Sequence, residues 1–185
     1  MASSDQSSNS RPTGSPVLEA KVLTVSDGVA AGTRKDTGGG AVADCLESAG
    51  FRVVERRISS DGVDEVANTL TYFAYGFNGV IVTTGGTGFG PRDLTPEATK
   101  RVLDRTAPGI SEAMRAVNPL GRLSRNIAGI RGRALILNTP GSPGGAVEML
   151  EVVLDILPHV VELMAGITDS HPEAAGSAHG KHDHG

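Results

Sequence analysis

The chain has 185 residues, a formal net charge of −4 and one cysteine, with 38% hydrophobic and 21% charged residues. This length suits a single globular domain, and the acidic balance argues against a nucleic-acid partner. One cysteine excludes an intramolecular disulfide and a cysteine-rich zinc site. No apolar run approaches the ~20 residues that cross a bilayer, so we expect no membrane partner.

The two ends of the chain differ in composition from its middle. Residues 1–16 are rich in serine and have no apolar centre, so we predict a disordered tail rather than a secretory signal. Residues 170–185 hold four histidines among Gly, Ala and Ser. We predict a flexible C-terminal tail, with weak metal binding as the alternative. Residues 17–169 are expected to form the folded domain.

Between the tails, short apolar runs alternate with segments of helical periodicity. In chain order, we predict a strand at 18–25, a helix at 41–49, a strand at 51–58, a helix at 61–75, a strand at 79–84, two short helices at 96–104 and 110–118, a strand at 134–138 and a long helix at 147–163. Pro158 should kink or divide the last helix. The alternation predicts an α/β fold: a three-layer sandwich with a mostly parallel central sheet and helices on both faces.

In open sheets of this kind, ligands bind outside the carboxyl ends of the strands. The predicted strands end near Val25, Ile58, Thr84 and Asn138, and the loops that follow are rich in Gly, Ser, Asp, Asn or Pro. We therefore expect these loops to converge on one site.

The third of these loops is the most informative. Thr84-Gly85-Gly86-Thr87-Gly88 follows a buried-strand pattern and leads to a helix start at Pro96. Such a junction offers backbone N–H groups and a helix dipole to an anion. It is not a P-loop, because no Lys-Ser or Lys-Thr follows. A tight turn without a ligand is the alternative reading.

Two carboxylates accompany this loop. Asp93 lies just after it, and Asp61 follows the second strand. Each side chain alone is equally compatible with capping the helix that follows it. Two carboxylates at the carboxyl edge of the sheet, beside a loop that could bind an anion, also suit a Mg²⁺ ion that bridges to phosphate oxygens.

Together these motifs resemble the molybdopterin-binding MoaB/Mog family. The likeness runs from about Leu18 to Gly166. The segments that carry it are 25–27, 35–38, 84–88, 92–98, 123–125 and 134–141.

The resemblance implies a cytoplasmic, homotrimeric α/β enzyme of molybdenum-cofactor synthesis. Such an enzyme uses Mg²⁺ to transfer AMP from ATP to the terminal phosphate of molybdopterin, with release of pyrophosphate. It further implies a molybdenum insertase as a downstream partner. The family's two functional aspartates fall on Asp61 and Asp93, as catalytic groups and metal ligands.

The expected contacts to phosphate, nucleotide and molybdopterin follow from the same resemblance. We expect the glycine loop to orient phosphate or nucleotide, Arg125 to reach a phosphate, and Ser124 with the 138–141 segment to hold the pterin. The full set of expected binding residues is Ser26, Asp27, Thr84, Gly85, Gly86, Thr87, Gly88, Ser124, Arg125, Asn138, Pro140 and Gly141.

Two other functions fit the same pattern. A molybdopterin carrier or scaffold would bind without transferring AMP, although the intact Arg92-Asp93 pair favours an enzyme. A different nucleotide hydrolase of similar fold would turn over ATP without a pterin acceptor.

Overall fold

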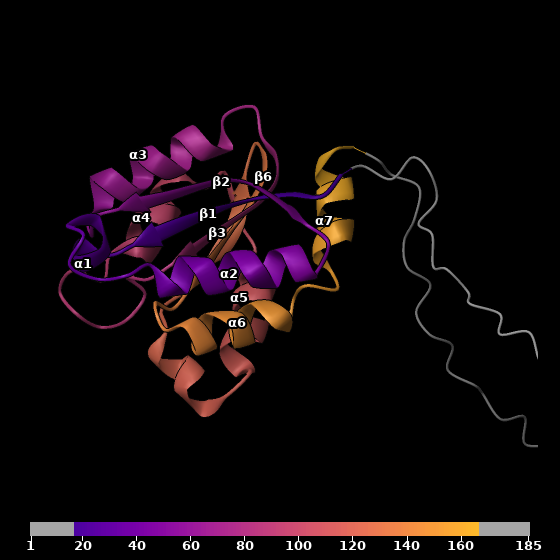
Figure 1. Cartoon of the computed structure of the whole chain (residues 1–185). Helices are drawn as coiled ribbons and strands as arrows, with labels where there is room; N and C mark the ends of the chain where they lie inside the picture. The colour runs from indigo at the N-terminus through magenta and orange to yellow at the C-terminus, as the bar shows by residue number, and fades with distance from the viewer. Residues whose placement is uncertain (1–16, 167–185) are drawn as a thin grey trace, which may run out of the picture.

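The computed structural model describes residues 17–166, so the tails expected at 1–16 and 170–185 lie outside the described residues. One six-stranded sheet runs through the domain in the order β2-β1-β3-β6-β5-β4 (Figure 1). Its strands are β1 (Glu19–Val25), β2 (Arg52–Ser59), β3 (Asn78–Thr84), β4 (Arg105–Thr106), β5 (Ala128–Arg131) and β6 (Arg133–Thr139). The first four strands in that order are parallel, whereas β5 pairs antiparallel with β6, and β4 pairs antiparallel with β5.

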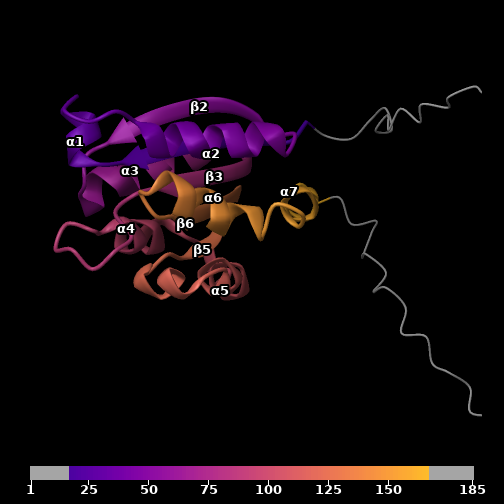
Figure 2. The same cartoon turned by 60° about the horizontal axis from the view of Figure 1, so that its bottom comes forward.

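Helices cover both faces of this sheet. They are α1 (Asp27–Ala30), α2 (Thr37–Ser48), α3 (Val63–Ala74), α4 (Thr95–Val102), α5 (Pro108–Ala116), the 3₁₀ helix η1 (Pro119–Leu123), α6 (Pro143–Glu151) and α7 (Leu157–Met164). The apolar residues of α3 and α4 pack on one face, and those of α2, α5, α6 and α7 pack on the other. In Figure 2, α2 and α6 lie next to each other, and α5 lies beyond β5. The three-layer, mostly parallel arrangement is therefore confirmed.

The central strand β3 is buried on both faces of the sheet, so helices must cover both faces. Val80 and Val82 point into the cluster under α2, while Ile81 points into the cluster under α3. All three side chains are fully buried. Successive residues of a strand face opposite sides, so a continuous apolar run indicates a strand buried on both faces. None of the helices in residues 17–166 is long and apolar enough to cross a bilayer.

The long C-terminal helix is divided, as predicted. α6 ends at Glu151, and α7 begins at Leu157 with Pro158 in its first turn. Proline is tolerated there because the first N–H groups of a helix have no intrahelical acceptor. Gly166 follows α7 with φ of +80°.

Helix α2 begins four residues before its predicted start. Asp36 caps it: its Oδ1 accepts from the Gly39 N–H at 2.9 Å and from Thr24 Oγ1 at 2.9 Å. A Cβ on Gly39 would collide with Thr24 and Asp36. The Gly38-Gly39-Gly40 run therefore lies in the first turns of the helix, close against β1, whereas the prediction began the helix at residue 41.

Three further elements were not predicted: the helical turn α1, the 3₁₀ helix η1 and the antiparallel pair β5–β4. β4 and β5 have only two and four residues, too short for a recognisable alternation. Gly129 lies where a Cβ would collide with Leu103 and the Arg105 carbonyl oxygen. Close approach of the backbones at this edge thus depends on one glycine.

Candidate active site

Four loops meet at the carboxyl edge of the parallel strands, as expected, and two adjoining cavities open there. The first cavity, of about 520 Å³, we call the polar cavity. Its lining comes from the loops after β1, β2, β3 and β6 and includes Ser26, Arg34, Lys35, Asp61, Thr84 and Gly85. The first turn of α2 also faces it, through Thr37 and Gly38.

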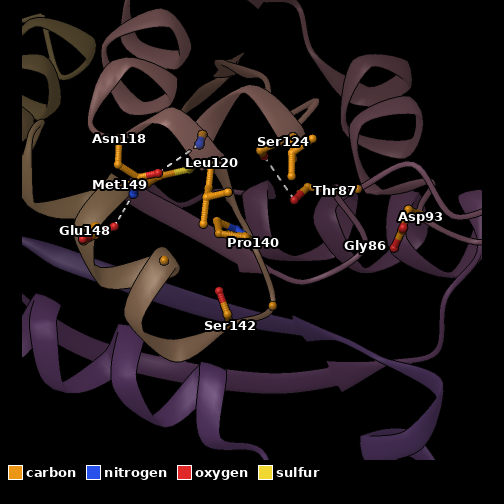
Figure 3. Close-up of a pocket in the computed structure, with 15 residues that line it drawn as sticks. Gly86, Thr87, Asp93, Asn118, Leu120, Ser124, Pro140, Ser142, Glu148 and Met149 are labelled. Atoms are coloured by element: carbon orange, nitrogen blue, oxygen red, sulfur yellow. Dashed lines mark hydrogen bonds between the residues drawn. The ribbon is translucent and has the colours of Figure 1, made fainter.

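The second cavity, of about 460 Å³, we call the leucine cavity (Figure 3). Its lining comes from the glycine loop, η1, the loop after β6 and α6. Apolar side chains that line it are Leu120, Leu123, Pro140 and Met149. Its polar side chains include Thr87, Asn118, Ser124 and Glu148.

Both cavities share Gly86, Asp93, Gly141 and Ser142 in their linings. We call these four residues the seam. A molecule in one cavity would therefore reach a molecule in the other beside the Asp93 carboxylate.

The glycine loop is held in a shape that only glycine tolerates. Gly85 and Gly86 have φ of +105° and +63°, a region that disfavours side chains. Thr95 fixes the turn by donating its hydroxyl to the Gly85 carbonyl oxygen at 2.9 Å and its N–H to that of Gly86 at 3.0 Å. The N–H groups of residues 86–88 donate to no acceptor among the described residues. Free N–H groups beside a helix start suit an anion.

Asp93 does not cap α4, whose N-cap is Leu94 without a side-chain hydrogen bond. Its Oδ2 instead accepts from the Gly90 N–H at 2.8 Å. A Cβ on Gly88 or Gly90 would lie 2.9 or 2.8 Å from that oxygen. The two glycines therefore let the loop wrap closely around a half-buried carboxylate at the seam.

Asp61 does not cap α3 either, because Gly62 is the N-cap and makes no side-chain bond. Its Oδ2 accepts from the Asp27 N–H at 2.8 Å. Its Oδ1 lies 3.2 Å from the position that a Cβ of Gly86 would take. The helix-cap reading is thus wrong for both aspartates, and both carboxylates line the polar cavity.

An ion pair ties three of the loops together. Arg92 donates from Nε to Asp27 Oδ2 at 2.7 Å and from Nη2 to Asp27 Oδ1 at 3.0 Å. Arg92 Nη2 also donates to the Asp61 carbonyl oxygen at 2.7 Å, and Asp27 Oδ1 accepts from the Asp61 N–H at 3.0 Å. The hydrogen bond from Arg92 lowers the pKa of Asp27.

Three of the expected binding residues do not line either cavity. The Asp27 carboxylate is engaged by Arg92 and the Asp61 backbone, so it orders loops instead. Asn138 is fully buried, where it donates to Thr83 Oγ1 at 3.0 Å and Thr99 Oγ1 at 2.9 Å. It joins β6 to β3 and α4 and has no path to a ligand.

Arg125 is the third expected binding residue that lines neither cavity. Its Nε donates to the Gly88 carbonyl oxygen at 2.7 Å, its Nη2 to that of Asp93, and its Nη1 to Glu97. The pKa of Glu97 is lowered chiefly by this hydrogen bond. Arg125 therefore holds the loop that carries Asp93, and its donors are not turned toward a phosphate.

The remaining expected residues do line the cavities. Ser26, Thr84 and Gly85 face the polar cavity, whereas Thr87, Gly88, Ser124 and Pro140 face the leucine cavity, and Gly86 and Gly141 face both. The Ser124 hydroxyl donates to Thr87 Oγ1 at 3.2 Å, which joins η1 to the glycine loop.

Sequence reasoning missed several lining residues. Arg34 and Lys35 bring positive charge to the polar cavity, and the segment 35–38 was noted only as part of the family pattern. Ser142 begins α6 at the seam, and its side chain makes no capping bond. Leu123 was noted only as part of the family pattern. Asn118, Leu120, Glu148 and Met149 carried no signal, because isolated residues of these types are common on helix surfaces.

The carboxylate pair of the polar cavity fits Mg²⁺. Asp61 and Asp93 supply carboxylate oxygens, and residues 17–166 hold no group of three or more His, Cys, Asp or Glu that would form a closed metal cage. Mg²⁺ usually takes one or two carboxylates and completes its shell with water and phosphate oxygens.

Known proteins resemble this chain in sequence and fold. A family described as "Probable molybdopterin binding domain" matches residues 21–159. Molybdopterin adenylyltransferase of Helicobacter pylori is 38% identical over 152 residues, which cover 78% of this chain and 86% of that protein.

A solved structure and a larger protein are also similar. The crystal structure of the molybdopterin biosynthesis enzyme MoaB from Thermus thermophilus superposes with a TM-score of 0.77 at 44% identity, and the match covers 81% of this chain and 98% of that one. The molybdenum cofactor biosynthesis bifunctional protein of Chlorobaculum tepidum is 32% identical over 149 residues, which are 78% of this chain but 48% of that protein.

Proposed function

The chain belongs to the molybdopterin-binding MoaB/Mog family, and we propose that it transfers AMP from ATP to the terminal phosphate of molybdopterin, with release of pyrophosphate. The observation that carries the proposal is the seam. Two cavities of different chemistry meet there beside Asp93, as a reaction between two substrates requires.

The linings assign one substrate to each cavity. ATP suits the polar cavity, because Arg34, Lys35 and the first turn of α2 face it and favour phosphate groups. Molybdopterin suits the leucine cavity, because apolar side chains line it beside hydrogen-bonding groups, as is typical of ring-binding pockets. The phosphate ends of both substrates then meet at the seam.

The chemical step needs little acid–base help. A phosphate monoester is largely ionised at neutral pH, so an oxygen of the molybdopterin phosphate can attack the α-phosphorus of ATP directly. A new P–O–P bond forms, the bond from the α-phosphorus to the oxygen bridging to the β-phosphorus breaks, and pyrophosphate leaves with that electron pair.

The protein must bring two anions together and hold them in line. The free N–H groups of residues 86–88 would orient phosphate oxygens at the seam. Asp61 and Asp93 would hold Mg²⁺, and when bound this ion supplies positive charge against the phosphates. Arg92 and Arg125 keep the two carboxylate-bearing loops in place.

The direct test is pyrophosphate release by the full chain with ATP, Mg²⁺ and molybdopterin. We expect one pyrophosphate per adenylylated molybdopterin and none when molybdopterin is omitted. Binding of molybdopterin without any pyrophosphate would favour a carrier or scaffold. ATP turnover without a pterin acceptor would favour a hydrolase.

The family further supports three proposals, on oligomeric state, location in the cell and partner. We propose a homotrimer in the cytoplasm, with a molybdenum insertase as the partner that receives the product. The match to about half of a bifunctional cofactor-synthesis protein supports a second protein acting on the same intermediate. Light scattering at micromolar concentration should return a trimer mass, and a monomer mass would contradict the first of these proposals.

A further inference from the structure

Glu148 lies on α6 and lines the leucine cavity, with no role so far in the proposed reaction. Its Oε2 accepts a hydrogen bond from Asn118 Nδ2. Its Oε1 accepts no hydrogen bond from the residues that the structure describes, and no lysine or arginine lines this cavity. The carboxylate is therefore open to donors on a ligand.

Asn118 fixes where this carboxylate lies. Its Oδ1 accepts from the Gly121 N–H at 3.1 Å, which caps η1, while its Nδ2 donates to Glu148. One amide thus bridges η1 and α6 across the cavity wall. A carboxylate oriented in this way needs less ordering when a ligand binds.

Glu148 and Asp93 are far apart within the cavity. Figure 3 shows Glu148 and Asn118 at one end and Asp93 at the other, with Leu120 and Pro140 between them. The reacting phosphate belongs at the Asp93 end under the proposed function. The end of molybdopterin remote from that phosphate, which is the pyrimidine edge of its pterin, then falls at Glu148.

The wall between these ends suits a flat ring. Leu120 and Leu123 are 73% and 61% exposed, so a ring that lies over them would bury apolar surface. Met149, which is buried, closes the cavity from α6.

We infer that Glu148 is a specificity-determining residue that recognises the 2-amino and N3–H donors of the pterin; this inference rests on the proposed function. Those two donors lie side by side on the 2-amino-4-oxo ring. An ionised carboxylate offers two acceptor oxygens in one plane and forms strong paired hydrogen bonds with such an edge. A ring with a 2-oxo group would instead place an acceptor against a negative oxygen.

The test compares two ring phosphates that differ only at position 2. The probes are 6-hydroxymethylpterin phosphate and its 2,4-dioxo counterpart, 6-hydroxymethyllumazine phosphate, with dissociation constants measured by calorimetry. The unaltered protein should prefer the pterin by about tenfold or more, because the lumazine leaves a carboxylate oxygen facing an acceptor. Molybdopterin itself should compete with both.

Glu148→Gln provides the decisive comparison. Its side chain offers one acceptor and one donor, which match the N3–H and 2-oxo groups of the lumazine. We expect the preference to shift toward the lumazine by about tenfold or more. Glu151→Gln, an exposed glutamate on the same helix outside the leucine cavity, should keep the pterin preference.

The outcomes separate the two claims. If Glu148→Gln keeps the original preference and melting temperature, Glu148 only supports Asn118, and the inference is overturned while the proposed function stands. If the unaltered protein binds neither ring phosphate and does not release pyrophosphate with molybdopterin, the proposed function fails and the inference fails with it.

Discussion

The polar cavity is lined mainly by turns that directly follow parallel strands, whereas much of the leucine cavity is lined by η1 and one side of α6. The first presents the start of α2 and two basic side chains, and the free N–H groups of residues 86–88 lie at the seam and in the adjoining leucine cavity. The second presents leucines, a methionine and a glutamate that an amide holds in place. The polar cavity thus offers basic side chains and a helix start to phosphate groups, whereas the leucine cavity offers apolar side chains to a ring.

A change at the seam should affect the reaction between the two substrates rather than the binding of one of them. Asp93→Asn keeps the shape and can still accept from the Gly90 N–H, but it removes the charge that a hard cation needs. We expect turnover to fall by about 10²–10³-fold, with both substrates still bound and stability changed by less than ~1 kcal/mol. Asp44→Asn, an exposed change on α2, serves as the control. Near-normal turnover in Asp93→Asn would remove Asp93 from the mechanism.

Changes in the polar cavity should affect ATP alone. The double variant Arg34→Ala with Lys35→Ala removes two exposed cations from its lining. We expect the KM for ATP to rise by roughly tenfold, because each of the two solvent-screened ion pairs contributes up to about 1 kcal/mol. The dissociation constant for molybdopterin should not change. An equal loss of affinity for both substrates would contradict the assignment of one substrate to each cavity.

Changes in the leucine cavity should show the opposite pattern, with a smaller effect. Leu123→Ala removes an exposed side chain, so the fold should lose little. A ligand ring that covers the leucine would lose about 1 kcal/mol of contact, or roughly fivefold in molybdopterin affinity. ATP binding should remain unchanged, and calorimetry with each substrate separately checks both expectations.

The Arg92–Asp27 pair should stabilise the loops in a pH-dependent way. Arg92 lowers the pKa of Asp27 below its ordinary value of 3.8. The stabilisation is therefore complete above that value and is lost as the pH falls through the lowered pKa. We expect Asp27→Asn to melt slightly below the unaltered protein at neutral pH and to match it in strong acid. A gap that widens in acid would contradict this sign.

The smallest effect concerns the tails. Residues 1–16 and 170–185 lack apolar periodicity, so they should add little folding energy. A chain trimmed to residues 17–169 should keep its melting temperature and its turnover. A loss of more than a few degrees would show that a tail docks on the domain.

The same contrast explains which features the sequence could reveal. Apolar runs such as Val80–Val82 predicted the central parallel strands, because strands buried on both faces are rich in apolar residues. The glycine loop was recognisable because its backbone shape excludes side chains. η1 and the β5–β4 edge had neither signal, so the part of the leucine-cavity wall that η1 supplies was missed.

The direction in which a side chain points also could not be predicted from the sequence. Asn138 and Arg125 lie within family motifs, but position along the chain does not say where a side chain points. Asn138 is the last residue but one of β6 and points between Thr83 and Thr99. Arg125 turns back onto the Gly88 carbonyl oxygen. Both side chains bond to other protein groups next to the site. Only the structure shows that they do so instead of contacting a ligand.

The most direct test of a shared seam is displacement by the proposed product. Adenylylated molybdopterin should span both cavities, so it should displace a labelled non-hydrolysable ATP analogue and labelled molybdopterin over the same concentration range. Fluorescence or equilibrium dialysis on the full chain would measure both. Displacement of both ligands at matching concentrations is the result that this account predicts. Displacement of only one, with the other still bound at saturation by the product, would contradict a site in which the two cavities meet at Asp93.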